Sequence, residues 1–495
     1  MTGRGAKVDN LAVLADHTRM ERTLSGERAE KLLPSECLQG GTMALLHGRL
    51  DEADRLAGDA MAGATAALGQ VGGDRSAGLR ELLALRARAR TLAGRCQLER
   101  FDYARARQSL LAARSDWRHW PDSDPLGAAA TEAALASLFW LCDEPDDAVQ
   151  AARTALRALA TARENGTRLD AVYLATHLAF VDVPGRSIAE IRDQLVSAHD
   201  WLLEEPAAHP LEIANVLFVM AMIEQRLGHH REAARVFDEA GALRIQVLGE
   251  DHPYVGYVLH GKAQTALDLG DFPDCVRLAD GALHLVTSHL GPEHPNVTTF
   301  LLTRGMGVLL GDSPDRFDEA RKNFDAGLKV SQTHFGQHSP QNATAWLMLG
   351  VAHYAAAAAE AAEETLHTAL HLSLTHPRTR GDVAITALRH LFELWRFQGR
   401  YEDVVRAAFF AVEVWTKYPT LSPEPAVRWA MEGAESALEV DDERGAHELL
   451  DLAWAVAADS PMVGDTLLGA LERIRRSVAS LRDGSSSDEP PDSRN

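Results

Sequence analysis

A six-residue motif that occurs three times decides the fold: Leu248-Gly-Glu-Asp-His-Pro253, Leu290-Gly-Pro-Glu-His-Pro295 and Phe335-Gly-Gln-His-Ser-Pro340. The copies begin 42 and then 45 residues apart. In each copy a glycine follows one amphipathic stretch and a proline precedes the next. Glycine suits the position after a helix, and proline suits the first turn of the following helix. The motif therefore predicts a helix-to-helix junction that returns at a regular interval.

A row of small residues extends the same interval along most of the chain. Its members are 42 to 45 residues apart: Ala113, Ala155, Ala198, Ala240, Ala282, Gly327, Ala369, Ala411 and Ala453. An earlier member, Ala60, precedes Ala113 by 53 residues, and the Gly/Ala-rich stretch 61–78 accounts for the extra length. A fixed period of this size indicates stacked supersecondary units rather than one closed globule.

Companion residues accompany each member of this small-residue row at fixed offsets. Small residues stand seven positions before it, at Ala53, Ala106, Ala148, Ala233, Cys275, Ala320, Ala362 and Ala446. Larger apolar residues stand three positions before it, at Leu110, Leu195, Phe237, Phe324, Leu366 and Leu450. These offsets place all three positions on one face of a helix, which we call helix B. A preceding helix A is expected to end at a glycine in several units, namely Gly48, Gly228, Gly270 and Gly399.

These residues resemble the tetratricopeptide repeat, in the 42-residue variety of kinesin light chains and bacterial arrays. The best-matched segment runs from His252 to Ala282, with Leu259, Gly270 and Asp274 at positions of the pattern. The resemblance covers residues 36–457 and is strongest over 210–416. It implies an all-α fold, a right-handed α-solenoid of about ten helical hairpins. In such families helices A line a concave groove that holds a segment of a partner protein.

The chain is expected to divide into five parts. Residues 1–35 form a tail and a capping helix, 36–204 degenerate repeats, 205–457 well-matched repeats, 458–482 a C-terminal capping helix and 483–495 a disordered tail. The C-terminal helix has one apolar face, formed by Leu467, Leu468, Leu471, Ile474 and Val478. Capping elements are expected because the terminal repeats of an array have no neighbour to cover their outer apolar face.

The composition of the chain argues against some classes of partner and indicates a compartment. A net charge of −21 argues against nucleic acid and anionic membranes as partners. The four cysteines are far apart and form no CxxC pair, which indicates a reducing compartment without disulfides. Together with the absence of an apolar N-terminal segment, this predicts a cytoplasmic protein. The Arg-rich stretch 75–118 is either a surface for an acidic partner or a solvated helix face. The oligomeric state stays open.

No catalytic or cofactor motif is complete. The string Gly256 to Ala263 is close to a phosphate-binding loop, but Ala263 replaces the required Ser or Thr and the string falls within a helix A. His367 and His371 are spaced to share a metal, yet the intervening Glu and a third ligand are absent. There is no GxSxG elbow and no kinase signature. We expect no enzyme activity, no cofactor and no metal site.

The predicted function is a non-catalytic scaffold or adaptor that binds a partner protein or peptide segment in its concave groove. The alternative is a signal-sensing regulator that responds to a peptide or small ligand and works with a Ser/Thr kinase or transcriptional regulator. The polar clamp of chaperone-binding arrays is missing, which favours an apolar or helical segment. Six residues on helices A are expected near the groove: His260, Lys262, Gln264, Thr303, Asn342 and Trp346. Trp346 could equally pack against its own helix B.

The small-residue row yields a first testable prediction. Replacing Ala240 or Ala282 by Phe should separate adjacent helices and cost about 1–3 kcal/mol or more, because a well-packed interface has no room for the ring. Since each repeat touches only its neighbours, the damage should begin locally. Thermal melting by circular dichroism measures the effect, and a variant that melts like the parent would remove these residues from the helix interface.

Overall fold

A computed structural model describes most of the chain as helices and the turns between them. The described residues are 32–46, 49–70, 76–100, 102–119, 124–142, 144–165, 172, 174–176, 178–179, 181, 183, 186–204, 210–375, 377–417, 423–458 and 464–484. No strand occurs among them. The all-α fold expected from the repeat is therefore confirmed for this part of the chain.

The chain divides into two compact units, which we describe separately. Unit 1 comprises residues 1–269 and 284–290, and unit 2 comprises residues 270–283 and 291–495. The helix α13 (Phe272–Leu290) contributes to both. The five-part division expected from the sequence rests on repeat quality and stays a prediction.

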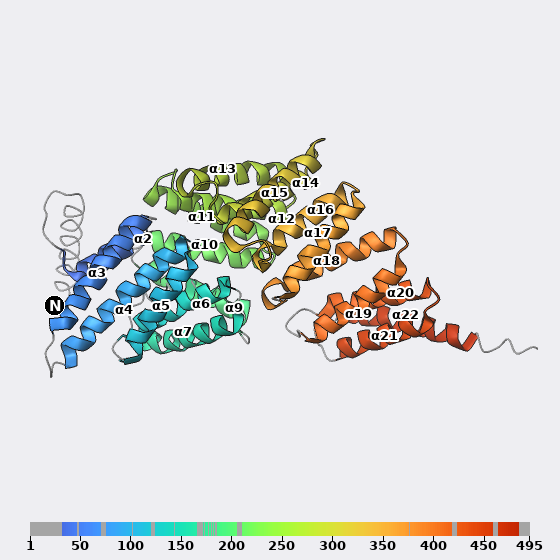
Figure 1. Cartoon of the computed structure of the whole chain (residues 1–495), viewed down its shortest axis with the longest axis horizontal. Helices are drawn as coiled ribbons and strands as arrows, with labels where there is room; N and C mark the ends of the chain where they lie inside the picture. Colours follow the sequence, from blue (N-terminus) through green and yellow to red (C-terminus); the bar gives the residue numbers. More distant parts are fainter. Residues whose placement is uncertain are drawn as a thin grey trace, which may run out of the picture. The chain divides into compact units, whose positions relative to one another are not determined.

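Unit 1 is built from helical hairpins. Its helices are α2 (Pro34–Leu46), α3 (Leu50–Gln70), α4 (Ser76–Glu99), α5 (Tyr103–His119), α6 (Pro125–Leu141), α7 (Pro145–Asn165), α9 (Ile188–Leu202), α10 (Pro210–Arg226), α11 (His230–Leu248) and α12 (Pro253–Asp268). Between α7 and α9, residues 172, 174–176 and 178 are also helical. Consecutive helices pack closely in the pairs α2/α3, α4/α5, α6/α7 and α10/α11 (Figure 1).

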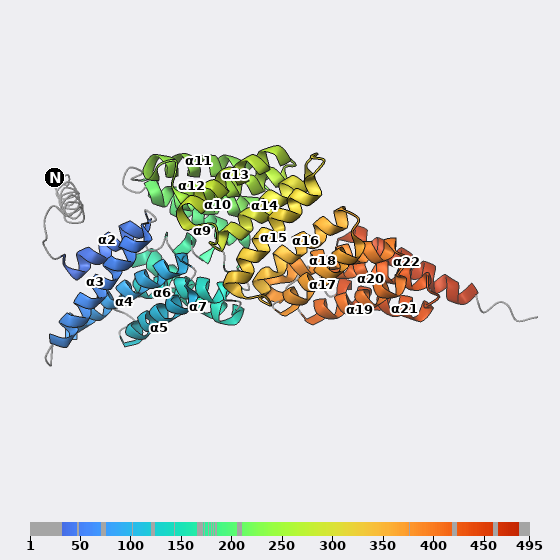
Figure 2. The same ribbon diagram turned by 45° about the horizontal axis from the view of Figure 1, so that its top comes forward.

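Unit 2 repeats the pattern. After α13 come α14 (Asn296–Leu310), α15 (Arg316–Phe335), the 3₁₀ turn η1 (Pro340–Asn342), α16 (Ala343–Ala355), α17 (Ala359–Thr375), α18 (Pro377–Phe397), α19 (Tyr401–Lys417), α20 (Pro423–Leu438), α21 (Glu443–Ala458) and α22 (Asp465–Gly484). The pairs α14/α15, α16/α17 and α20/α21 pack as hairpins (Figure 2). The arrangement is a helical solenoid, as the repeat predicts.

The small-residue row lies at the packed interfaces. Each member falls in a different helix B: α3, α5, α7, α9, α11, α13, α15, α17, α19 and α21. All members are buried except Ala198, which is half-buried. The residues seven positions earlier have no exposed surface at all. The assignment of these positions to the helix interface is confirmed.

The junctions are formed as the repeated motif predicts, with one variation. Gly228, Gly270 and Gly399 after helices A have φ of 70–78°, the left-handed region that only glycine adopts without strain. Gly48 lies outside the described residues. Pro253 opens α12, whereas Pro295 precedes α14 as its cap and Pro340 opens the 3₁₀ turn η1. The 3₁₀ turn occurs in the copy of the motif that has Ser-Pro in place of His-Pro.

Histidine recurs in the junction because it caps the next helix. The Nδ1 atoms of His252 and His294 accept hydrogen bonds from the backbone N–H groups of Tyr254 and Asn296, at 3.1 and 3.3 Å. In the third copy Ser339 does the same for Gln341, at 3.3 Å. Each side chain satisfies one of the amide groups that a helix start leaves unpaired. These two histidines therefore have a structural role at the start of the next helix.

The Gly/Ala-rich insertion lengthens two helices. Most of stretch 61–78 is helical, since α3 continues to Gln70 and α4 begins at Ser76. Alanine is the best helix former, so added alanines extend existing helices at little cost. The insertion therefore changes helix length more than it changes connectivity.

Six of the eleven arginines of stretch 75–118 form ion pairs with other helices or with the junctions between them. Arg86 and Arg90 of α4 both bind Asp116 of α5, with N–O distances of 2.7 Å, and Asp116 is only 7% exposed. Further pairs join Arg88 to Asp124, Arg100 to Asp51 and Asp54, Arg107 to Glu144, and Arg114 to Glu132. The stretch is thus used mainly within the array, which neither expectation from the sequence anticipated.

The helix α22 follows the last hairpin. Leu467, Leu471 and Val478 are at most 7% exposed, and the helix packs against α20 and α21. Residues 1–31 and 485–495 lie outside the described residues, and so do most of the expected N-terminal capping helix and nearly all of the expected tail. Of the helices that the structure describes, none combines the length and the apolar character needed to cross a bilayer.

Glycines within helices A leave space for the large apolar residue of a neighbouring helix B. A Cβ atom on Gly305 of α14 would lie 2.4 Å from Cε1 of Phe324 in α15, and one on Gly261 of α12 would lie 2.5 Å from Cζ of Phe237 in α11. Both phenylalanine rings have no exposed surface. Helices A and B can approach this closely only where one of them lacks a side chain.

We predict opposite effects for two helix glycines. Gly305→Ala should lower the free energy of unfolding by about 1–3 kcal/mol, because the enclosed Phe324 ring has no space to move away. Gly58→Ala in α3 should raise it by about 0.5–1 kcal/mol, because a Cβ there meets nothing within 4 Å and alanine is the better helix former. Thermal and urea unfolding measure both. Equal effects would show that helix propensity, and not the close approach, governs these positions.

Candidate functional site

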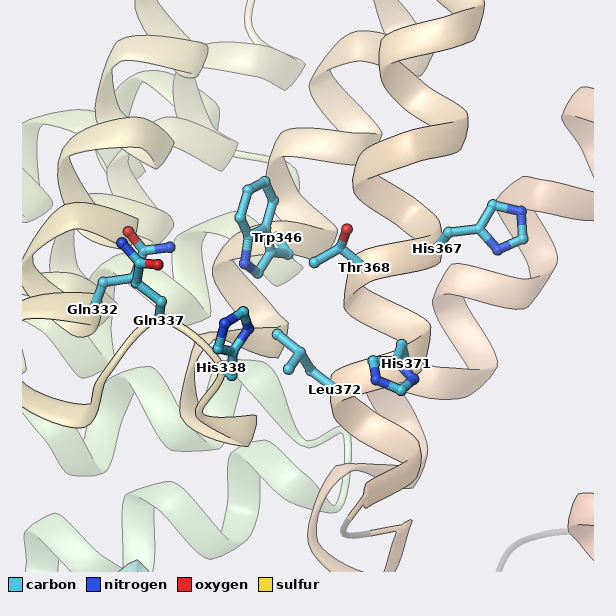
Figure 3. A pocket seen from close by; sticks show the side chains of 8 residues that line it. All are labelled: Gln332, Gln337, His338, Trp346, His367, Thr368, His371 and Leu372. Carbon is cyan, nitrogen blue, oxygen red and sulfur yellow. The ribbon is translucent and has the colours of Figure 1, made fainter.

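A cavity of about 510 Å³ lies in unit 2 between α15, α16 and α17. Eight residues line it: Gln332 of α15, Gln337 and His338 of the following junction, Trp346 of α16, and His367, Thr368, His371 and Leu372 of α17. Figure 3 shows Trp346 at its centre, between the two glutamines on one side and the side chains of α17 on the other. We call it the Trp346 cavity.

The indole of Trp346 has an unmet hydrogen-bonding requirement. Its ring packs partly into the core of the hairpin, whereas its Nε1 atom is buried and has no acceptor among the residues that the structure describes. A buried N–H group without a partner costs about 1–3 kcal/mol, and an oxygen atom from outside could accept from it once the indole turns toward the cavity. Beside it Leu372, 5% exposed, supplies apolar surface.

The rim of the Trp346 cavity is polar. Gln337, His338 and His371 are exposed, and Gln332 is half-buried. Among the described residues none of these four side chains has a hydrogen-bond partner. The lining includes no carboxylate, lysine or arginine. Amides, imidazoles and an indole N–H fit the alternating donors and acceptors of a peptide backbone.

His367 belongs to a separate network at the edge of the cavity. In Figure 3 its ring points away from Trp346, and it lies 5.6 Å from the ring of Trp395 in α18. Glu363 accepts hydrogen bonds from Trp395 Nε1 at 3.0 Å and from Arg400 at 2.6 Å. Hydrogen bonding from Arg400 lowers the pKa of the Glu363 carboxyl, against the opposing effect of its burial. These contacts fix the α17–α18 packing.

The six residues expected near the groove are distributed over both units. His260, Lys262 and Gln264 lie on α12 in unit 1 and are half-buried, with Lys262 Nζ 2.6 Å from Asp238 Oδ1. Thr303 of α14, in unit 2, is 7% exposed. Asn342 and Trp346 also belong to unit 2, and Trp346 is the only one of the six that lines the cavity.

Asn342 stabilises the junction before α16. It has no exposed surface, accepts a hydrogen bond from Ser331 Oγ at 2.7 Å, and donates to the carbonyls of Gly336 and Gln337 at 2.8 and 3.0 Å. Its hydrogen-bonding atoms are thus occupied inside the protein. The loop that it holds carries Gln337 and His338, so Asn342 positions part of the cavity without lining it.

The location of the cavity differs from the expected groove of helices A. Trp346 is its only lining residue from a helix A, and the other seven come from helices B or the junction. Gln332, Gln337, Thr368 and Leu372 were not singled out from the sequence. Gln332 stands five residues after Gly327 and Thr368 stands one residue before Ala369, and such offsets from the small-residue row are the signal that could have identified these two.

The described part of the chain contains no candidate metal site. No group of three His, Cys, Asp or Glu side chains there could hold a metal ion. The stretch Gly256 to Ala263, which is close to a phosphate-binding loop in sequence, lies wholly inside α12. Its backbone N–H groups are thus in a helix rather than in a phosphate-binding loop.

A family model described as the tetratricopeptide repeat matches residues 219–254. The match begins within α10, includes α11 and ends at the start of α12. With the repeated hairpins and the periodic row of small residues, it identifies the chain as a tetratricopeptide repeat protein.

Three solved structures are similar to this chain at low identity. A Rap protein complexed with Competence and Sporulation Factor is 14% identical, with a TM-score of 0.46, and the match covers 72% of this chain and 99% of that one. Yeast Tom70 is 12% identical, with a TM-score of 0.44 and coverage of 92% and 97%. BtubC (BKLC) from P. vanneervenii is 14% identical, with a TM-score of 0.35 and coverage of 63% and 96%. No curated protein matches the sequence. None of these likenesses assigns a ligand to this chain.

The placement of Asn342 gives a prediction about stability. Asn342→Ala should cost about 1–3 kcal/mol, because it leaves the Ser331 hydroxyl and two loop carbonyls without their partner. Asn342→Asp should also destabilise, since it keeps an acceptor for Ser331 but removes both amide donors. Thermal melting of the two variants checks this. Unchanged melting in both would show that the side chain is free to meet a partner instead.

Proposed function

We propose that this protein is a non-catalytic interaction scaffold that binds a peptide segment of another protein at the Trp346 cavity. The tetratricopeptide repeat architecture fits a role in protein interaction or sensing, and proteins of this fold are generally non-catalytic scaffolds. The proposal includes a cytoplasmic location and excludes nucleic acid and membranes as partners, in keeping with the net charge of −21.

The observation that carries the proposal is the buried Trp346 N–H group without an acceptor. A backbone carbonyl or a carboxylate of the bound segment would satisfy it, and the free amides of Gln332 and Gln337 would pair with neighbouring peptide groups. Tryptophan at the centre of a pocket is also a frequent energetic anchor of interfaces. The proposal therefore places the contact mainly on helices B. A groove of helices A around His260 and Gln264 is the competing outcome.

The experiment isolates the N–H group from the ring. A partner is identified by crosslinking in the native host, and its binding segment is then titrated as a purified peptide by calorimetry. Trp346→Phe keeps an aromatic ring but removes the donor, so we expect binding to weaken about tenfold, for the loss of about 1.4 kcal/mol. Trp454→Phe, at another half-buried tryptophan in α21, is the control and should leave affinity unchanged.

Two further variants separate the alternatives. The double variant His260→Ala, Gln264→Ala should bind like the parent if the Trp346 cavity carries the interaction. Affinity lost in that variant, with Trp346→Phe unaffected and both proteins melting normally, would contradict the proposal and favour the groove of helices A.

A further inference from the structure

A second cavity, of about 490 Å³, lies in unit 1 between α5, α6 and α7. Like the Trp346 cavity, it is lined by residues of two consecutive helices B and of the helix A between them. We call it the Trp117 cavity, after the tryptophan of α5 that lines it.

The two cavities use equivalent positions of the repeat. Arg118 and Gln332 both stand five residues after the small residue of the first helix B, Ala113 or Gly327. Thr154 and Thr368 both stand one residue before the small residue of the second helix B, and Glu132 and Trp346 both stand 23 residues before it. The same groove of the repeat is thus open in both units, with different side chains in it.

The floor of the Trp117 cavity is apolar and complete in itself. Trp117 is 5% exposed, and its Nε1 atom donates to Thr131 Oγ1 at 2.9 Å. Phe139 and Ala151 beside it are 6% and 2% exposed. Unlike Trp346, this tryptophan needs no acceptor from outside. The floor therefore suits an apolar side chain.

The rim of the Trp117 cavity carries charges of both signs. Arg114 and Glu132 neutralise each other through two hydrogen bonds, of 2.7 and 2.5 Å. Arg118 and Asp147 are exposed and also line the cavity. Neither has an ion-pair partner among the residues that the structure describes. One cation and one anion thus remain available around an apolar floor.

We propose that the Trp117 cavity is a second docking site, which binds a protein segment with an apolar anchor residue between an acidic and a basic residue. The anchor lies on Trp117 and Phe139, the acidic residue pairs with Arg118 and the basic residue with Asp147. The side chain of Gln150, exposed on the wall, is available to the backbone of the segment, whereas the Thr154 hydroxyl already donates to the carbonyl of Gln150 at 3.0 Å. Complementary charges at a rim select the partner and its orientation more than they add affinity.

The test starts from a phage-displayed library of random dodecapeptides, selected on the full-length protein. We expect enrichment of peptides with an apolar residue between residues of opposite charge. Binding of the synthesised peptides, followed by fluorescence anisotropy, should weaken about tenfold for Arg118→Glu and for Asp147→Arg. The double variant Arg118→Glu, Asp147→Arg should regain affinity for a peptide whose two charges are exchanged.

Two more variants complete the design. Arg153→Glu makes the same charge change at an exposed position of α7 that does not line the cavity, so it should bind like the parent. Ala128→Trp fills the cavity from α6 and should abolish binding while the charges remain. Thermal melting of each variant separates lost binding from lost fold.

The outcomes distinguish this inference from the proposed function. Peptides that depend on Arg118 and Ala128 but tolerate Trp346→Phe support a second site. The inference is wrong if the selected peptides bind the Arg118→Glu and Ala128→Trp variants with the same affinity as the parent. It is also wrong if the selection enriches no such pattern. Dependence on Trp346 alone would leave the proposed function standing and remove the second site.

Discussion

The array depends on how closely its helices approach each other at alanine and glycine. At Gly305 and Gly261 the facing phenylalanine occupies the space where a Cβ atom would be. The small residues of helices B, such as Ala240 and Ala369, have no exposed surface. A steric limit of this kind sets the spacing of the helices at these interfaces. The apolar and polar contacts between neighbouring helices are possible only at this short separation.

Much of the fold could be predicted from the sequence because steric limits leave a local trace. A position that admits only a small residue recurs with the repeat, as Ala113 and Ala155 do, and glycines with positive φ, such as Gly270, mark the ends of helices. The histidines His252 and His294 recur because each of them caps the helix that follows. Each of these residues performs its role within one hairpin or one junction, so its spacing in the sequence is enough.

The candidate site was harder to predict because its side chains come from different elements. Trp346 was expected near the groove, but the cavity that it lines is formed by α15 and α17 as well as by α16. Asn342 is a polar residue in an expected helix, and only the folded junction shows that its amide is occupied. Arg86 and Arg90 looked like part of a basic surface until Asp116 of the neighbouring helix was placed between them. Partners of this kind are set by tertiary contacts, which composition and spacing do not encode.

The residues that line the two cavities are distinct from the small-residue row and its companions three and seven positions before. Packing uses the small residue of helix B and the positions three and seven before it, whereas both cavities use positions such as Thr154 and Thr368, Arg118 and Gln332. The two sets alternate along the same helices. The cavity-lining residues of one repeat can consequently change, and with them the segment that it binds, while the packing of its helices is kept. Duplication of a hairpin would add a further cavity at the same positions of the repeat.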